Sequence, residues 1–436
     1  MPSPGERTTH RRRLLAVATV LLATIGAACS HNDDDAGRTV VEVFGPIVGE
    51  PGQRLGQALR EVSADSTVEL RYVGVTSFNE QLEDRLASGD RPGIALLPQP
   101  GLLDELATRG ILQPLPTDVA DASRDQFPPR LVDLVTIDEQ PAAVWLTVDI
   151  KSLIWYRPSA FHQRGLEIPT TLDELADLSE HIRTSEDGVA PWCLTMEAGA
   201  SSGWVGTDWV EDYTIRRLGP DRYDQWTDGA LPFDSQPITD VFDELADLLR
   251  RPGAVDGGTR AVLTTPWERS ANLLLEQPAT CIMAHQAEFL RREFPTGTRI
   301  GPDGDIDFFV LPAADTTPPP LLLGGTLAVP LVGGHSVEAA MRLIASPELA
   351  EQLDQTSDFL SPHLDVDRQT VTDATSNRLL DLLAGTPEVR FDGSDLMPPA
   401  VGTGTFWTGM RTFFAGDDIG TVLADIQAGW PVTQSD

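Results

Sequence analysis

The sequence predicts an α/β protein of two lobes, preceded by an export signal and a short tether. Three observations lead to this prediction. Residues 40–109 alternate between strand-like and helix-like segments, which is typical of a mainly parallel sheet. The chain beyond the signal has about 400 residues, which is long for one hydrophobic core. A long apolar stretch, Ala142–Tyr156, could carry the chain from one lobe to the other.

The first 28 residues have the features of an export signal. Three arginines, Arg11–Arg13, precede an apolar run, Leu14–Ala28, that is too short to span a bilayer and ends in small residues. The run Gly26-Ala-Ala-Cys29 resembles a bacterial lipobox, although the commonest pattern has Leu at the position of Gly26. We therefore expect acylation of Cys29; ordinary cleavage nearby is the alternative. Residues 29–39 are polar and acidic, and they read as a tether.

The chain has three cysteines: Cys29, Cys193 and Cys281. An odd cysteine in an exported protein requires an explanation, and acylation of Cys29 supplies one. The other two are then left as a pair in an oxidising compartment. We expect a disulfide between Cys193 and Cys281, with two separate buried thiols as the alternative.

The charge of the chain is strongly negative. Removal of residues 1–28 takes away four Arg and one Glu, which leaves 28 basic against 65 acidic residues and a net charge of −37. Such a surface repels nucleic acid and anionic lipid headgroups at long range. We therefore expect no nucleic-acid partner and no strongly anionic ligand.

The first part of the chain is predicted to form a β-α-β-α-β series. Three segments have strand-like apolar patterns: Val40–Pro46, 67–74 and 93–100. Three segments have helical patterns: 51–66, 77–90 and 101–109. Ser77 and Glu80 have the spacing of a capping box at the start of the second helix. In a mainly parallel sheet ligands bind at the carboxyl ends of the strands, where residues 47–50 and 98–100 lie.

The rest of the chain supplies the second lobe and returns to the first. Predicted helices cover these segments: 170–185, 237–253, 264–279, and 336–356 with a break at Pro347. Predicted strands cover these: 280–286, 306–312 and 321–331. The C-terminal part ends in a helix that reaches about Ala428.

One stretch, Ala190–Asp212, combines aromatic and acidic side chains. Three of the nine tryptophans lie in it, among four acids: Trp192, Trp204, Trp209, Glu197, Asp208, Glu211 and Asp212. Aromatic faces beside carboxylates suit a sugar, whose CH-rich faces stack and whose hydroxyls donate to the acids. The alternative is a buried strand and an amphipathic helix whose tryptophans belong to the core.

Two enzyme functions compete with sugar binding on the same residues. Gly199–Gly203 fits G-x-S-x-G, so Ser201 is a candidate esterase nucleophile; the candidate acids and histidines are Asp307, Asp365, His335 and His363. Glu197 with Asp208 is a candidate carboxylate pair of a glycosidase. The run Asp303–Asp307 lacks the Gly that a calcium loop requires, because Phe308 takes its place, and no histidine has metal-ligand spacing. We expect neither a metal nor another cofactor.

The order of the segments resembles the solute-binding lipoproteins of bacterial ABC importers, in the branch that binds maltose-like and other α-glucosides. The resemblance covers about Val40–Pro431. It rests on these pieces in succession: SFNEQLEDRLASGDRPGIALLPQPGLLDELATRG, KSLIWY, PTTLDEL, PWCLTMEAGASSGWVGTDWVED, the Cys281 strand with HQAEF, IDFFVLP and SDLMPPAVGTGTFWTGM. The chain departs from the pattern at His285, where this branch carries a basic residue beside the following Gln.

The resemblance implies a two-lobed type II periplasmic-binding-protein (maltose-binding-protein-like) fold, with a hinge and a cleft between the lobes. Lobe one would comprise residues 40–148 and 312–348, and lobe two 149–311 and 349–431. By position, the ligand-binding residues would be Glu50, Gln99, Glu197, Trp204, Gln286, Gly325 and Trp407. The implied protein is a non-enzymatic, extracytoplasmic, lipid-anchored monomer. It would deliver a neutral α-glucoside or oligosaccharide to ABC permease subunits.

Overall fold

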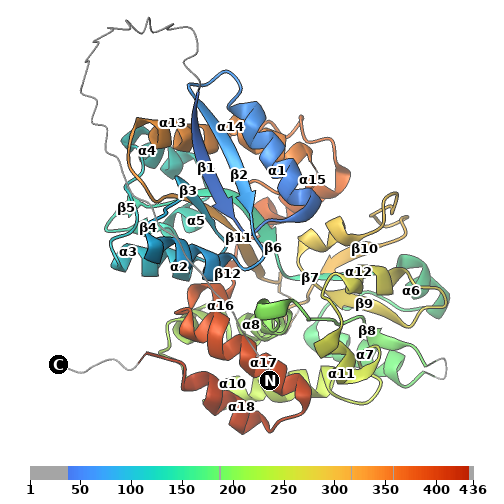
Figure 1. Ribbon diagram of the computed structural model, residues 1–436. Helices are drawn as coiled ribbons and strands as arrows, with labels where there is room; N and C mark the ends of the chain where they lie inside the picture. The colour runs from blue at the N-terminus through green and yellow to red at the C-terminus, as the bar shows by residue number, and fades with distance from the viewer. Residues whose placement is uncertain (1–37, 186–187, 316, 357, 432–436) are drawn as a thin grey trace, which may run out of the picture. The chain divides into compact units, whose positions relative to one another are not determined.

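The computed structural model describes residues 38–185, 188–315, 317–356 and 358–431 (Figure 1). Cys29 and the predicted signal lie outside the described residues. Among the described residues, no helix is both long and apolar enough to cross a bilayer.

A six-stranded sheet organises the first part of the chain. Its strands are β1 (Thr39–Gly45), β2 (Val68–Gly74), β3 (Ile94–Leu97), β6 (Val144–Ile150), β11 (Leu321–Pro330) and β12 (Val389–Phe391). The pairs β1–β2, β1–β3 and β11–β12 are parallel, whereas β11 runs antiparallel to β3 and β6. Every side chain of β3 and β11 is buried, which explains why these strands read as continuous apolar runs rather than alternating ones.

Helices cover this sheet and fill the connections between its strands. They are α1 (Gly49–Val62), α2 (Phe78–Ser88), α3 (Pro100–Thr108), α4 (Thr117–Gln126), α5 (Pro129–Asp133), α13 (His335–Ile344), α14 (Pro347–Gln355) and α15 (Ala374–Gly385). Helix α1 packs on β2 and on α14, as Figure 1 shows. A short hairpin, β4 (Thr136–Ile137) and β5 (Gln140–Pro141), lies against α4. The predicted β-α-β-α-β series is thus confirmed.

A four-stranded sheet and a helical layer form the other part. The strands, in the order β10-β7-β9-β8, are β10 (Asp307–Val310), β7 (Leu153–Tyr156), β9 (Cys281–His285) and β8 (Ala190–Trp192). The helices are α6 (Pro158–Arg164), α7 (Leu172–Arg183), α8 (Trp204–Leu218), α9 (Pro220–Thr227), α10 (Gln236–Leu249), α11 (Gly258–Thr264), α12 (Arg269–Leu275), α16 (Gly393–Leu396), α17 (Trp407–Ala415) and α18 (Ile419–Gln427). Helix α8 packs against α10 and α17 through a core that includes Trp209, Phe242 and Phe413.

In the described residues, the chain passes three times between the part with the six-stranded sheet and the part with the four-stranded sheet and its helices. It crosses from β6 to β7 through Lys151 and Ser152, from β10 to β11 through residues 311–320, and from β12 to α16 at Asp392. The predicted passage at Ala142–Tyr156 is therefore confirmed. The lobe boundaries stay a prediction, but β12 pairs with β11 and α14 packs on α1, so β12 and the part of α14 beyond residue 348 belong with the six-stranded sheet.

One face of α8 binds all three crossings. Asp208 accepts a hydrogen bond from Lys151, Asp212 accepts one from the Ser152 hydroxyl at 2.5 Å, and the Glu211 carboxylate accepts two from backbone amides of the third crossing. Arg216 donates to the carbonyls of residues 311, 312 and 320 in the second crossing. These four side chains follow the spacing of one helical face. Three of the four acids that were predicted beside a sugar, Asp208, Glu211 and Asp212, therefore bind the crossings.

Two local predictions are wrong. Ser77 precedes α2, but its side chain accepts no hydrogen bond from the helix, so the predicted capping box does not form. The predicted helix 264–279 is interrupted: α11 ends at Thr264, and α12 begins at Arg269. The cause is Pro266, since the residue before a proline avoids helical geometry and Thr265 is extended, with φ −104° and ψ 128°.

Candidate ligand-binding site

A cavity of about 1090 Å³ lies where the carboxyl ends of β1 and β3 meet the crossings and the start of α8. Its wall includes residues 46–51 after β1, Pro98 and Gln99 after β3, and Gly324–Thr326 within β11. Further parts of the wall come from residues 198–201, the first turn of α8, and segments after β9 and β12. This size and position are those of a small-molecule site at the strand ends of an open α/β sheet.

Aromatic rings form one wall of the cavity. Trp204 begins α8, and its ring centroid lies 5.4 Å from that of Trp267 and 5.8 Å from that of Phe289. The Trp267 and Phe289 rings are 5.5 Å apart at an angle of 84°. All three rings line the cavity, together with Trp407. The three rings hold one another in fixed orientations. A flat apolar surface of a ligand can stack on their faces.

Gly203 is what brings Trp407 next to α8. Its φ is +131°, and a Cβ there would lie 2.3–2.7 Å from backbone atoms of Trp407. Only a glycine tolerates both this backbone conformation and this approach. Trp204, at the start of α8, and Trp407, at the start of α17, therefore reach the same cavity from two helices.

Hydrogen-bonding groups lie on other parts of the wall. The Gln99 side chain, at the end of β3, accepts a hydrogen bond of 3.1 Å from the Asn79 amide, and the Asp395 carboxyl lines the cavity with it. Burial, together with the nearby Asp392, raises the pKa of Asp395 well above its ordinary value. Thr147 and Ser394 add hydroxyls to the wall. This mixture of amides, hydroxyls and a carboxyl can both donate and accept hydrogen bonds with ligand oxygens.

A buried ion pair forms the floor. The Lys151 ammonium donates to Asp392 at 2.6 Å and to Asp208 at 3.0 Å. Burial alone would raise the pKa of Asp392, but the charge of Lys151 outweighs it and lowers that pKa below its ordinary value. Burial raises the pKa of Asp208 to about 8, against the opposing charge of Lys151. The charge of Lys151 thus favours the ionised form of Asp392, whereas burial favours the protonated form of Asp208.

Three buried carboxyl groups, Asp208, Glu211 and Asp392, come close enough to suggest a metal site. The other contacts of these carboxyl groups indicate that they bind groups of the chain itself rather than a metal ion. Lys151 lies between Asp208 and Asp392, and Glu211 accepts backbone amide hydrogens from Gly393 and Ser394 at 3.0 Å each. A cation is thus already supplied by the chain, and we propose no metal here.

A second charged group also lies in the wall. Arg292 and Asp149 both line the cavity, with 3.8 Å between the nearest guanidinium nitrogen and carboxylate oxygen. Behind them is Glu288, and burial raises its pKa to about 8, although Arg291 and Arg292 oppose the shift. The Arg292 guanidinium also lies 5.3 Å from the ring centroids of Phe289 and Phe359.

Five of the seven predicted ligand-binding residues line this cavity: Glu50, Gln99, Trp204, Gly325 and Trp407. Glu50 lies in the first turn of α1 and is largely exposed, 3.4 Å from Arg54. Gly325 is required by the sheet itself, because a Cβ there would lie 2.5 Å from the Thr147 carbonyl oxygen. The role of these five residues in binding stays a prediction.

The other two predicted residues, Glu197 and Gln286, are not among those that line the cavity. The Glu197 carboxylate accepts a hydrogen bond of 2.8 Å from the Gly199 amide and so closes the turn before α8. Gln286 is 2% exposed, and its side-chain oxygen accepts a hydrogen bond from the Ala287 amide. Both side chains thus have local structural partners.

The esterase and glycosidase alternatives find no support in the geometry. Ser201 lies in a 3₁₀ turn, Gly199–Ser201, rather than at a strand-to-helix elbow. Of its candidate partners, His335 is exposed and lies 3.6 Å from Glu338, and His363 packs against the ring of Phe127. Asp208 is committed to Lys151, so it does not face Glu197 across the cavity as a glycosidase pair would.

Sequence reasoning missed much of the wall: Asn79, Asp149, Lys151, Trp267, Phe289, Arg292, Asp392 and Asp395. Two signals were present. Lys151 is the only lysine of the chain, and Trp267 follows a proline that interrupts a helical pattern. Neither signal indicates that Lys151 or Trp267 contacts residues from distant segments of the chain.

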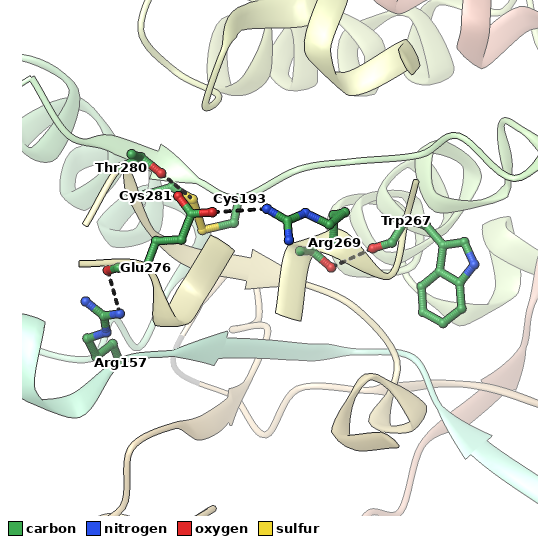
Figure 2. Close-up of a disulfide and its surroundings, with 8 residues drawn as sticks. Arg157, Cys193, Trp267, Arg269, Glu276, Thr280 and Cys281 are labelled. Carbon is green, nitrogen blue, oxygen red and sulfur yellow. Dashed lines mark hydrogen bonds and ion pairs between the residues drawn. A yellow bond between two sulfur atoms is a disulfide. The ribbon is translucent and has the colours of Figure 1, made fainter. Parts of the chain in front are cut away.

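The predicted disulfide is confirmed. Cys193 follows β8 and Cys281 begins β9, with 5.3 Å between their Cα atoms (Figure 2). Thr280 and the ion pair of Arg269 with Glu276 lie beside it, and Arg157 donates to the Glu276 carbonyl. The disulfide thereby ties the strand before residues 198–201 to the strand before Phe289, and both of these regions line the cavity.

Two sheets joined by three crossings beside a cavity of this size define the type II periplasmic-binding-protein fold of maltose-binding-protein-like receptors. Solved structures share it. The bacterial solute receptor AcbH superposes with a TM-score of 0.75 at 17% identity, over 90% of this chain and 98% of that one. The GacH receptor of Streptomyces glaucescens superposes with a TM-score of 0.68 at 14% identity, over 90% and 97%.

A family model described as bacterial extracellular solute-binding protein matches residues 56–266. The osmoprotective compounds-binding protein GgtB of Synechocystis is 32% identical over 96% of this chain and 98% of its own length. The alpha-glucosides-binding periplasmic protein AglE of Rhizobium meliloti is 34% identical over 91% and 88%. The chain therefore belongs to the family of bacterial extracellular solute-binding proteins. These relatives are named as binding proteins, not as enzymes.

Proposed function

We propose that this chain is the sugar receptor of an ABC importer, and that it binds a neutral α-glucoside or oligosaccharide in the cavity. The observation that carries the proposal is the wall itself, where Trp204, Trp267, Phe289 and Trp407 lie with amides, hydroxyls and carboxyls. Sugar rings have apolar CH faces and polar edges, so they match a wall that stacks and hydrogen-bonds at once. The name of AglE, an alpha-glucosides-binding protein, supports such a ligand.

The charges around the rings favour a neutral ligand over a cationic one. Lys151 lies 5.3 Å from the ring centroid of Trp204, and Arg292 lies 5.3 Å from that of Phe289. A quaternary ammonium compound would seek these same ring faces, and it would meet two cations already there. Sugars, which carry no charge, escape this repulsion.

Binding would be coupled to a change in the angle between the two sheets. Ligand that contacts residues from both sheets favours the closed arrangement by its additional contacts. The three crossings are the segments about which such a movement would occur. Closure would present the loaded receptor to the permease subunits in the membrane, and the receptor itself would act as a monomer.

The proposed location of the protein rests on the predicted signal and on the sequence around Cys29. We propose that Cys29 is acylated, palmitate included, and that residues 29–39 tether the receptor to the outer face of the cell membrane. Detergent phase partitioning of the full chain and of its Cys29→Ala variant tests this. The unaltered chain should enter the detergent phase and the variant the aqueous phase; two aqueous proteins would contradict the anchor.

Calorimetry tests the ligand. Purified protein should release heat with at least one of maltose, trehalose and sucrose, and none with glycine betaine. A ligand at 100 times its Kd should also raise the free energy of unfolding by about 2.7 kcal/mol, which a thermal shift would report. Binding of betaine with no response to any sugar would replace the sugar proposal by one for a quaternary ammonium solute.

A further inference from the structure

Lys151 is unusual in this chain because it is the only lysine among 32 basic residues. It lies in the crossing from β6 to β7, is 8% exposed, and lines the cavity. The other positively charged side chains of this protein are arginines, and only position 151 has a lysine. A lysine ammonium is a compact point charge, whereas a guanidinium is a broad planar fork.

The surroundings of Lys151 are shaped for its side chain. Gly324 lies opposite, and a Cβ at that position would be 2.9 Å from the Lys151 Cε. Trp204 and Asp208 stand four residues apart on α8, so they share one face of that helix. Lys151 meets both of them, through a hydrogen bond to Asp208 and through the ring of Trp204. The ammonium thus lies over the Trp204 ring, 5.3 Å from its centroid.

One N–H donor of the Lys151 ammonium has no acceptor among the described residues. A lysine has three N–H donors. Asp208 and Asp392 take two of them, and within the described part of the chain no third hydrogen bond from the Lys151 Nζ is present. The Nζ lies 5.3 Å from the ring centroid of Trp204, in the wall of the cavity. An oxygen at the edge of a sugar ring stacked on Trp204 would come within its reach.

We propose that Lys151 is a specificity-determining residue, which donates its remaining N–H to one oxygen of a sugar stacked on Trp204. This inference rests on the proposed sugar-binding function. Lys151 thereby selects sugars that have an acceptor oxygen at the contacted position of the sugar ring. A sugar analogue without this oxygen would leave the buried Lys151 donor unpaired. Because Lys151 also binds Asp392, in the third crossing, the same contact joins the ligand to two of the crossings between the sheets.

The first experiment uses the unaltered protein. Selective ¹⁵N-lysine labelling gives a single side-chain ammonium signal, since Lys151 is the only lysine. The probe is whichever of maltose, trehalose and sucrose binds most tightly by calorimetry. We expect this sugar at saturation to shift the ammonium signal. A signal that stays at its free position while calorimetry records binding would overturn the inference, whereas the absence of any sugar binding would refute the proposed function instead.

The second experiment separates contact from structural support. The Lys151→Met variant and the unaltered protein are titrated with the same sugar and with its monodeoxy analogues. The variant should bind the parent sugar about 10- to 100-fold more weakly, as for loss of a hydrogen bond from a charged group. For one deoxy analogue the two proteins should bind almost equally. An equal loss for every analogue would mean that Lys151 only supports the structure.

A fallback variant keeps this test decisive. Lys151→Met leaves Asp392 buried without its counter-charge and could unfold the protein. The double variant Lys151→Met, Asp392→Asn removes both charges, and its reference is the single variant Asp392→Asn. The same selective loss for one hydroxyl is expected between these two proteins, and a uniform loss between them would overturn the inference.

Discussion

Removal of the disulfide should destabilise the protein strongly without abolishing the binding site. The perturbation is the double variant Cys193→Ala, Cys281→Ala. The two cysteines are 88 residues apart. For a loop of this size the chain-entropy relation gives a stabilisation of about 4.6 kcal/mol at 25 °C, an upper figure because native geometry and residual unfolded structure reduce it.

Binding should survive because the strands are also joined by backbone hydrogen bonds. The Ala190 amide donates to the Thr280 carbonyl at 2.8 Å, and the Cys193 amide donates to the Met283 carbonyl at 2.7 Å. The register that positions the cavity wall is thus independent of the sulfur bridge. At 20 °C we expect the affinity for sugar to change less than about threefold, which corresponds to well under 1 kcal/mol.

Urea unfolding followed by tryptophan fluorescence measures the loss of stability. Thr280→Val is a matched control beside the bridge, since it removes a hydroxyl next to the Cys281 sulfur without opening the loop, and it should cost less than about 1.5 kcal/mol. A non-reduced digest of the unaltered protein should contain one cross-linked peptide pair. If the double variant is as stable as the control, the loop-closure reasoning is wrong.

Three further predictions concern the site and its support. Trp407→Ala should weaken sugar binding by about 1–3 kcal/mol, because it removes a large ring from the wall, whereas Ser201→Ala should weaken it by at most about 1 kcal/mol. Calorimetry measures both losses of binding free energy, and a larger loss for Ser201→Ala would favour the esterase function. Burial raises the pKa of Glu288 to about 8, so between about pH 5 and pH 8 the folded protein holds a proton that the unfolded chain has lost. Stability from this residue should fall by about 1.4 kcal/mol per pH unit as the pH rises, and Glu288→Gln should flatten that slope in unfolding experiments; an unchanged slope would contradict the assignment. Arg216→Met should lower the free energy of unfolding by about 3–5 kcal/mol, because it leaves Asp212 buried without the Arg216 cation and removes the donor to three carbonyls of the second crossing. A loss below about 1 kcal/mol in urea unfolding would show that the second crossing does not depend on Arg216.

The sequence by itself determined the elements and the order in which they occur. Val40–Pro46, the helix of residues 51–66 and the strand of Cys281 are visible because hydrophobic periodicity is a local property. The pairing of Cys193 with Cys281 followed from counting, since only three cysteines exist. The succession of segments was sufficient to predict the family and the fold.

Only the tertiary structure decided what each acid and each tryptophan does. Trp209 and Trp192 look like Trp204 in the sequence, yet the first two pack edge to face in the core at 4.9 Å, and the third faces the cavity. Asp208 was expected beside a sugar and instead holds Lys151, 57 residues away in the chain. Which partner a side chain meets depends on contacts between segments far apart in sequence, and those contacts arise only when the sheets and the three crossings come together around α8.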